Sequence, residues 1–111
     1  MIRLLEIQYE RDGWSFVFDV TEGVYHHLRY PVRVVGIGWT EDANQKARLG
    51  ELLSALLRQH LRQGSLPPTG LLVPLEHLKD HCRKTPEKTF RRKCLDALNA
   101  LPESIHPMTA T

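Results

Sequence analysis

Residues 14–20 (WSFVFDV) alternate between large apolar side chains and smaller or polar ones, and this pattern constrains the fold more than any other segment. A period of two is typical of a strand with one buried face, because successive side chains of a strand point to opposite sides. The apolar face of this strand consists of three aromatic side chains and a valine: Trp14, Phe16, Phe18 and Val20. We therefore expect a β-sheet that packs on a helix, as in an α+β domain.

Residues 1–40 are expected to form an N-terminal antiparallel β-meander of three to four strands. The first strand spans residues 2–9, and one of its faces is expected to contain these apolar side chains: Leu5, Ile7 and Tyr9. Asp12 and Gly13 then separate it from the strand at 14–20. Both residues tolerate positive φ, so they predict a tight type I′ hairpin turn.

Two further strands are expected at 24–30 and 32–39, with Pro31 between them. A second turn, Glu22-Gly23, precedes the pair. The glycines of Gly36-Ile37-Gly38 follow the last strand, but the third glycine of a dinucleotide fingerprint is missing three residues later. We therefore interpret them as a strand end that needs small residues, and we expect no bound nucleotide cofactor.

Residues 41–63 are predicted to form a long helix that covers the sheet. Thr40 is its expected N-cap, and Glu41 and Asp42 lie where the positive end of the helix dipole favours acidic side chains. Six leucines fall on one stripe at helical spacing: Leu49, Leu52, Leu53, Leu56, Leu57 and Leu61. Gly64 provides a stop signal at the C-terminal end of this helix.

The rest of the chain is expected to complete a single domain with two shorter helices. Residues 64–74 contain three prolines and two glycines and predict a loop. A helical pair follows over 74–101, with a first helix at 74–83 and a second at 86–101. Thr85 is the expected cap of the second helix, and Pro86 and Glu87 lie in its first turn. The last ten residues, 102–111, are expected to form a frayed tail.

The segment 83–93 is the most basic part of the chain. Its net charge is +5, because six basic side chains oppose only Glu87: Arg83, Lys84, Lys88, Arg91, Arg92 and Lys93. Phe90, Cys94, Ala97, Leu98 and Leu101 form the apolar arc of the second helix. Lys88, Arg92 and Lys93 point away from this arc, and Arg91 lies near its edge.

A short helix, a turn and a basic second helix are the ingredients of a DNA-binding helix-turn-helix. The basic side chains would contact phosphates, and Thr85 and Asn99 are the uncharged polar side chains that could reach base edges. We therefore expect a small non-enzymatic protein with a regulatory or accessory role that binds nucleic acid, DNA more than RNA.

The stretch VPLEHLKDHC…TPEKTFRRKCLDALNAL, within residues 73–101, resembles the winged-helix segment of some plasmid and phage replication proteins. The shared features are a leucine-rich short helix and a basic helix with an aromatic residue near its start and an Ala-Leu pair near its end. In this chain they correspond to Leu75, Leu78, Phe90, Arg91, Arg92, Ala97 and Leu98. The resemblance implies that the second helix contacts DNA.

A zinc site is the one metal site that the sequence suggests, and we do not expect it to form. His77 and His81 are four residues apart and share a helix face, as zinc ligands require. Cys82 and Cys94, in contrast, belong to the apolar faces of their helices, so the four side chains do not converge. We interpret the cysteines as buried free thiols, although a disulfide between them is conceivable if the two helices pack face to face.

A protein-binding adaptor or accessory subunit of a larger assembly is the competing hypothesis. Its interface would use exposed aromatic residues, either the strand face of Trp14, Phe16 and Phe18 or the strand 24–30 with Tyr25 and Tyr30. The partner in this hypothesis is another protein or a second copy of the chain. The sequence contains no apolar run of about 18 residues and no signal peptide, so we expect a cytoplasmic protein without a membrane partner.

Overall fold

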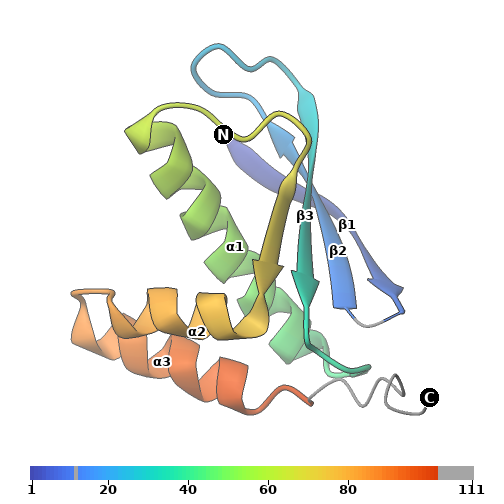
Figure 1. The fold of residues 1–111 in the computed structure, drawn as a ribbon, viewed down its shortest axis with the longest axis vertical. Coiled ribbons are helices and arrows are strands. Elements are labelled where there is room, and N and C mark those ends of the chain that lie inside the picture. Colours follow the sequence, from blue (N-terminus) through green and yellow to red (C-terminus); the bar gives the residue numbers. More distant parts are fainter. Residues whose placement is uncertain (12, 103–111) are drawn as a thin grey trace.

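The structure is a computed structural model that describes residues 1–11 and 13–102. It is an α+β fold, as the sequence predicts (Figure 1). The elements follow one another in this order: β1 (Ile2–Glu10), β2 (Gly13–Val20), β3 (Leu28–Val35), α1 (Ala43–Gln63), β4 (Leu71–Pro74), α2 (Leu75–Arg83) and α3 (Lys88–Asn99). The tail predicted at 102–111 lies outside the described residues, apart from Pro102.

The sheet has four strands in the order β1-β2-β3-β4. β1, β2 and β3 form the predicted antiparallel meander, and β4 pairs in parallel with β3 from Val32↔Leu71 to Val35↔Pro74. The prediction of an uninterrupted loop over 64–74 is therefore wrong. The strand could not be seen in the sequence, because four residues (LLVP) show no alternation and their strand conformation depends on pairing with β3.

A single strand, β3, replaces the two strands predicted at 24–30 and 32–39. Residues 24–27 lie outside any strand, and Pro31 lies inside β3. β4 begins to pair with β3 only at Val32, so at Pro31 the strand has a neighbour on one side alone. This is the position in which a proline disturbs a sheet least, so Pro31 does not divide the strand.

β1 contains a bulge that reverses part of its predicted pattern. The register passes from Leu4↔Phe18 directly to Glu6↔Val17, which leaves Leu5 as the extra residue. One extra residue moves the side chains before it to the other face. Leu4 therefore packs against the core, whereas Leu5 is exposed, and the prediction that Leu5 belongs to the core face is wrong.

Gly13 is the first residue of β2 and pairs with Glu10 and Val35, so it is not a turn residue as predicted. A Cβ atom at Gly13 would lie 2.2 Å from the carbonyl oxygen of Val34. Glycine is therefore required here by the close approach of β3. The expectation for Asp12 lies outside the described residues.

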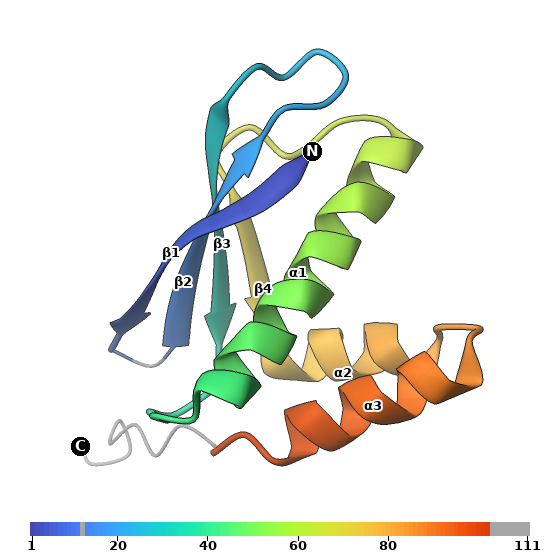
Figure 2. The ribbon, with the colours of Figure 1, turned by 180° about the vertical axis from the view of Figure 1, so that it is seen from behind.

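α1 lies across one face of the sheet (Figure 2). It buries the aromatic face of β2 completely, since Trp14, Phe16 and Phe18 are exposed by 3%, 0% and 0%. The prediction that these side chains form an exposed interface is therefore wrong: they are the centre of the core. The leucine stripe of α1 supplies the other side of this core with the following residues: Leu49, Leu52, Leu53 and Leu57.

α1 begins two residues later than predicted, because Asp42 and not Thr40 is its N-cap. The Asp42 carboxylate accepts hydrogen bonds from the backbone N–H groups of Asn44 (2.9 Å) and Gln45 (3.3 Å). The helix ends at Gly64 as predicted.

Two tyrosines fasten the loop that follows α1. The Tyr30 hydroxyl donates to the carbonyl oxygen of Pro67 at 2.7 Å, and the Tyr25 hydroxyl accepts from the N–H of Leu66 at 3.0 Å. Tyr30 is buried and Tyr25 is partly buried. Both side chains therefore hold the protein together internally, which corrects the prediction that they form a binding surface.

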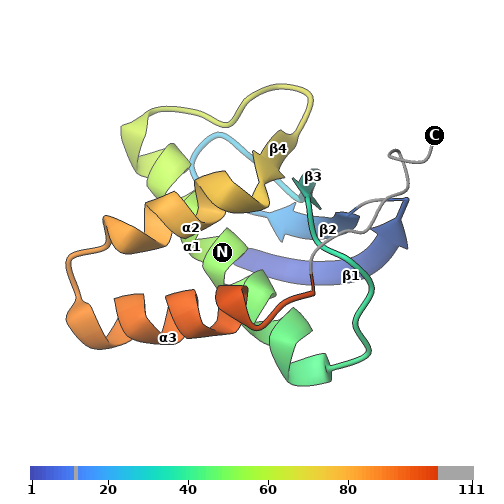
Figure 3. The same cartoon turned by 60° about the horizontal axis from the view of Figure 1, so that its bottom comes forward.

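α2 and α3 lie side by side and antiparallel, at one end of the sheet (Figures 1 and 3). Their facing sides bury Leu78, Cys82, Cys94 and Leu98. α2 begins at Leu75 and α3 spans Lys88–Asn99, one to two residues inside the predicted bounds.

Candidate nucleic-acid interface

α3 begins immediately after Glu87, whose carboxylate accepts a hydrogen bond from the backbone N–H of Phe90. The sequence predicts Thr85 as the cap, which is wrong because the Thr85 hydroxyl donates to the carbonyl oxygen of His81 at 3.2 Å instead. Thr85 and Asn99 are the two residues predicted to contact base edges. Because the Thr85 hydroxyl is bonded to α2, only Asn99 of these two has a free, exposed side chain within the described part of the chain.

Four of the six predicted basic residues have free, exposed side chains. Within residues 1–11 and 13–102, no ion pair or hydrogen bond involves the side chains of these residues: Arg83, Lys88, Arg92 and Lys93. Cations without a counter-ion attract polyanions, because the charge is not neutralised within the Debye length. We call these four residues the basic surface.

The other two predicted residues serve the structure. Lys84 forms an ion pair with Asp80, one turn earlier on α2, at 3.0 Å, and this contact lowers the pKa of the Asp80 carboxyl. Arg91 donates from Nη1 to the carbonyl oxygen of Thr85 at 3.0 Å and so ties α3 to the turn before it. Their charges add to the local field, but their side chains are not free to reorient.

The helical pair has the predicted order but not the crossing that defines the DNA-binding motif. In a helix-turn-helix the two helices meet at about 90–120°. α2 and α3 instead run antiparallel beside one another (Figure 3). The winged-helix resemblance therefore stays a hypothesis, and α3 presents its basic side chains from a helical hairpin.

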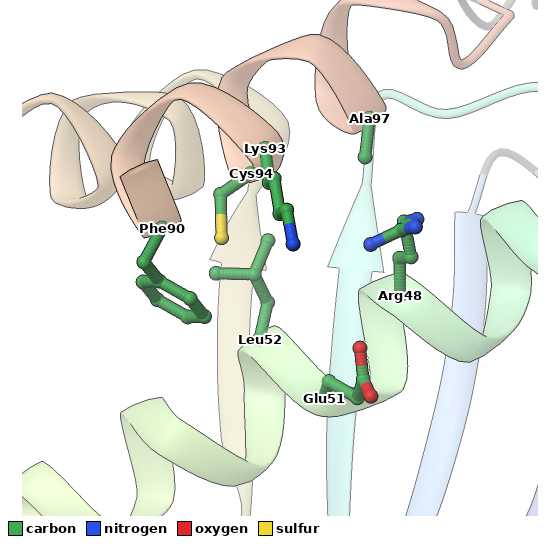
Figure 4. A pocket seen from close by; sticks show the side chains of 7 residues that line it. All are labelled: Arg48, Glu51, Leu52, Phe90, Lys93, Cys94 and Ala97. Carbon is green, nitrogen blue, oxygen red and sulfur yellow. The ribbon is translucent and has the colours of Figure 1, made fainter. Parts of the chain in front are cut away.

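A groove separates α3 from α1, and a cavity of about 250 Å³ lies in it. Its floor is apolar, with Leu52, Cys94 and Ala97, and Phe90 closes one side with a ring that is 40% exposed. Arg48 of α1 and Lys93 of α3 reach toward each other across the cavity, with Glu51 beside them (Figure 4). The sequence analysis missed Arg48, which lies one turn before Leu52 at the edge of the leucine stripe and is exposed.

Adjoining hollows continue the groove in both directions along α1. Toward the start of α1, Asn44 and Asp96 join Arg48 and Lys93. Toward the end of α1, Arg62 joins Phe90, and Lys84 and His81 lie across from it. Cationic side chains therefore follow the groove on both walls.

The side chains considered above as zinc ligands are His77, His81, Cys82 and Cys94. In the part of the chain that the structure describes, no cluster of three or more His, Cys, Asp or Glu side chains could hold a metal ion. Cys82 and Cys94 are free, buried and adjacent. Burial, reinforced by Cys94, raises the pKa of the Cys82 thiol to about 12, and burial also raises the pKa of Cys94, so neither thiol is a reactive nucleophile.

An aromatic cluster lies between the start of α1 and the end of the first hairpin. Trp39 stacks on Trp14 with ring centroids 5.6 Å apart, and Tyr9 meets both rings edge-on. Nζ of Lys46 lies 5.5 Å and 5.9 Å from the Trp14 and Trp39 centroids. Trp39 remains 55% exposed, which the sequence analysis did not anticipate.

The outer face of the sheet is occupied by cross-strand ion pairs. Arg3 pairs with Asp19 at 3.6 Å, and Arg29 pairs with Glu6 at 3.3 Å. Because its cations are already neutralised, this face is a weaker candidate for a polyanion than the basic surface.

Comparisons with protein families, with curated proteins and with solved structures find no match to this chain. No helix among the described residues is both long and apolar enough to cross a membrane. The site must therefore be interpreted from its own geometry.

Proposed function

We propose that this protein binds nucleic acid, DNA in preference to RNA, through the basic surface of α2 and α3, and that its role is regulatory or accessory. The observation that carries the proposal is the set of four exposed cations without counter-ions, Arg83, Lys88, Arg92 and Lys93, on one helical hairpin. Phosphate contacts of this kind supply most of the affinity of non-specific binding.

The shape of α3 supports the same proposal. Its 12 residues make a rod of about 18 Å, and one side of it is not covered by another element (Figure 3). A major groove of about 12 Å admits such a helix. Lys88 and Arg92 lie one turn apart on the outward side, so both can reach the same phosphate backbone.

Fluorescence anisotropy with a labelled duplex of about two helical turns, at about 50 and 200 mM salt, tests the proposal. Four phosphate contacts predict a loss of affinity of roughly two orders of magnitude over this range. The double variant Lys88→Glu/Arg92→Glu should abolish binding. A matched control is Arg11→Glu/Arg58→Glu, which makes the same charge change at exposed positions on the β1–β2 connection and on α1.

Equal loss of binding in both double variants would show that only total charge matters and would contradict an interface on α3. Absence of salt-dependent binding by the unmodified protein, to DNA and RNA duplexes alike, would refute the proposal itself.

A further inference from the structure

The groove between α1 and α3 combines two features, a pair of converging cations and an exposed aromatic ring. Arg48 and Lys93 come from different helices and converge on one cavity, where like charges repel unless an anion joins them (Figure 4). Neither side chain has a counter-ion among the described residues. Two acidic side chains lie nearby, Glu51 on this cavity and Asp96 in the adjoining hollow, but neither forms an ion pair with Arg48 or Lys93.

Phe90 supplies the second feature. Its ring forms one wall of the cavity and is 40% exposed, although Leu52 and Cys94 beneath it are buried. An aromatic face beside a cationic groove is the combination with which proteins hold unpaired bases, since the phosphate contacts the cation and the base stacks on the ring. Among the described residues, the other exposed aromatic ring beside a cation is Trp39 with Lys46, and it serves as the control below.

We propose that this groove holds an unpaired nucleotide, with its phosphate between Arg48 and Lys93 and its base against Phe90. At about 250 Å³ the cavity is smaller than the roughly 300–1,000 Å³ pockets of drug-sized ligands, so it suits one nucleotide of a strand. The inference rests on the proposed function and deepens it. The preferred partner is then a nucleic acid in which a single strand adjoins a duplex, because Lys93 belongs both to the groove and to the basic surface.

The test compares a blunt duplex with the same duplex carrying a single-stranded overhang of about five nucleotides. The unmodified protein should bind the overhang probe about 5- to 140-fold more tightly, the range expected for one stacked base. Phe90→Leu keeps the apolar volume but removes the aromatic face, so it should abolish this difference and leave blunt-duplex affinity unchanged. Arg48→Gln should lower the salt slope by about one on the overhang probe alone.

Trp39→Leu is the matched control, because it removes an exposed aromatic ring outside the groove. If Trp39→Leu and not Phe90→Leu abolishes the overhang preference, the inference is wrong and the stacking site lies on the aromatic cluster. Equal affinity of the unmodified protein for both probes overturns the inference and leaves the proposed function intact. Absence of binding to either probe overturns both.

Discussion

Gly13 and Gly23 both lie next to turns, yet the structure needs them for different reasons. Gly23 has a φ of 59° in the loop between β2 and β3, and a Cβ atom there would meet nothing within 4 Å. Gly13 has no positive φ, but a Cβ atom there would lie 2.2 Å from the carbonyl oxygen of Val34. Gly23 is needed for its backbone conformation, and Gly13 is needed for the close spacing of β2 and β3.

Gly13→Ala should therefore destabilise the protein by about 1–3 kcal/mol, since β3 must move to admit the methyl group. Gly23→Asn is the matched control and should cost less than about 1 kcal/mol, because asparagine tolerates the left-handed region and the space is open. Urea unfolding measures both. A Gly13→Ala variant as stable as the unmodified protein would contradict the close approach of β2 and β3.

Arg91 is a basic residue whose role the structure separates from that of its neighbour Arg92. Its bond to the Thr85 carbonyl predicts that Arg91→Gln lowers the free energy of unfolding by about 0.5–1.5 kcal/mol. Arg92→Gln, at an exposed position, should not change stability but should lower the salt slope of DNA binding by about one. If Arg91→Gln instead lowered the salt slope and Arg92→Gln lowered the stability, Arg91 would be the phosphate contact.

At the scale of elements, the sequence predicts best what has a local cause. α1 and the apolar face of β2 follow from periodicity within one segment, and both are confirmed. β4 exists because it pairs with β3, and the bulge at Leu5 follows from the register of two strands, so neither has a signal in its own segment. For the candidate site, helical geometry places Lys88 and Arg92 on the exposed side correctly.

Contributions that depend on packing between elements could not be predicted in this way. Arg48 joins the groove only because α3 packs beside α1, and the exposure of Phe90 depends on how far α1 covers α3. The sequence also does not say how completely α1 covers the aromatic face of β2, so it leaves this face open to an interface role that the structure excludes.

The partial burial of His81 on α2 should make stability depend on pH. Burial, together with the nearby His60, lowers the pKa of His81 in the folded protein. As the pH falls through the ordinary histidine pKa of about 6.5, the unfolded chain takes up a proton before the folded one does, so stability falls. Above this pH both states are neutral and the effect vanishes.

His81→Gln should therefore lose less stability than the unmodified protein between about pH 7 and pH 5, as measured by urea unfolding at each pH. His77→Gln, at an exposed histidine one turn earlier on α2, separates the loss of any histidine from the loss of the partly buried His81. An identical pH dependence in His81→Gln and the unmodified protein would exclude His81 as the cause.

At the scale of the whole molecule, the sheet and the helical hairpin share one core. The buried cluster runs from Phe16 and Phe18 of the sheet, through Leu53 of α1, to Leu78 and Leu98 of the hairpin. Two hydrogen bonds also join the end of the hairpin to the rest of the molecule: the Gly38 N–H of the β3–α1 connection donates to the Pro102 carbonyl (2.8 Å), and Gln45 Nε2 of α1 donates to the Ala100 carbonyl (3.1 Å). The basic surface is thus carried by an element that cannot loosen without disturbing the sheet.

Leu98→Ala, at a position that is 1% exposed, should consequently destabilise the whole molecule by about 2–5 kcal/mol. Tryptophan fluorescence reports on Trp14 in β2 and Trp39 in the β3–α1 connection, and far-UV circular dichroism reports mainly on the helices. Both should show the same unfolding midpoint in this variant. Leu72→Ala, at an exposed position on β4, is the control and should change stability by less than about 0.5 kcal/mol. A helical transition that precedes the fluorescence transition in Leu98→Ala would show that the hairpin unfolds on its own, and a nucleic acid bound to α3 would then stabilise the hairpin without stabilising the sheet.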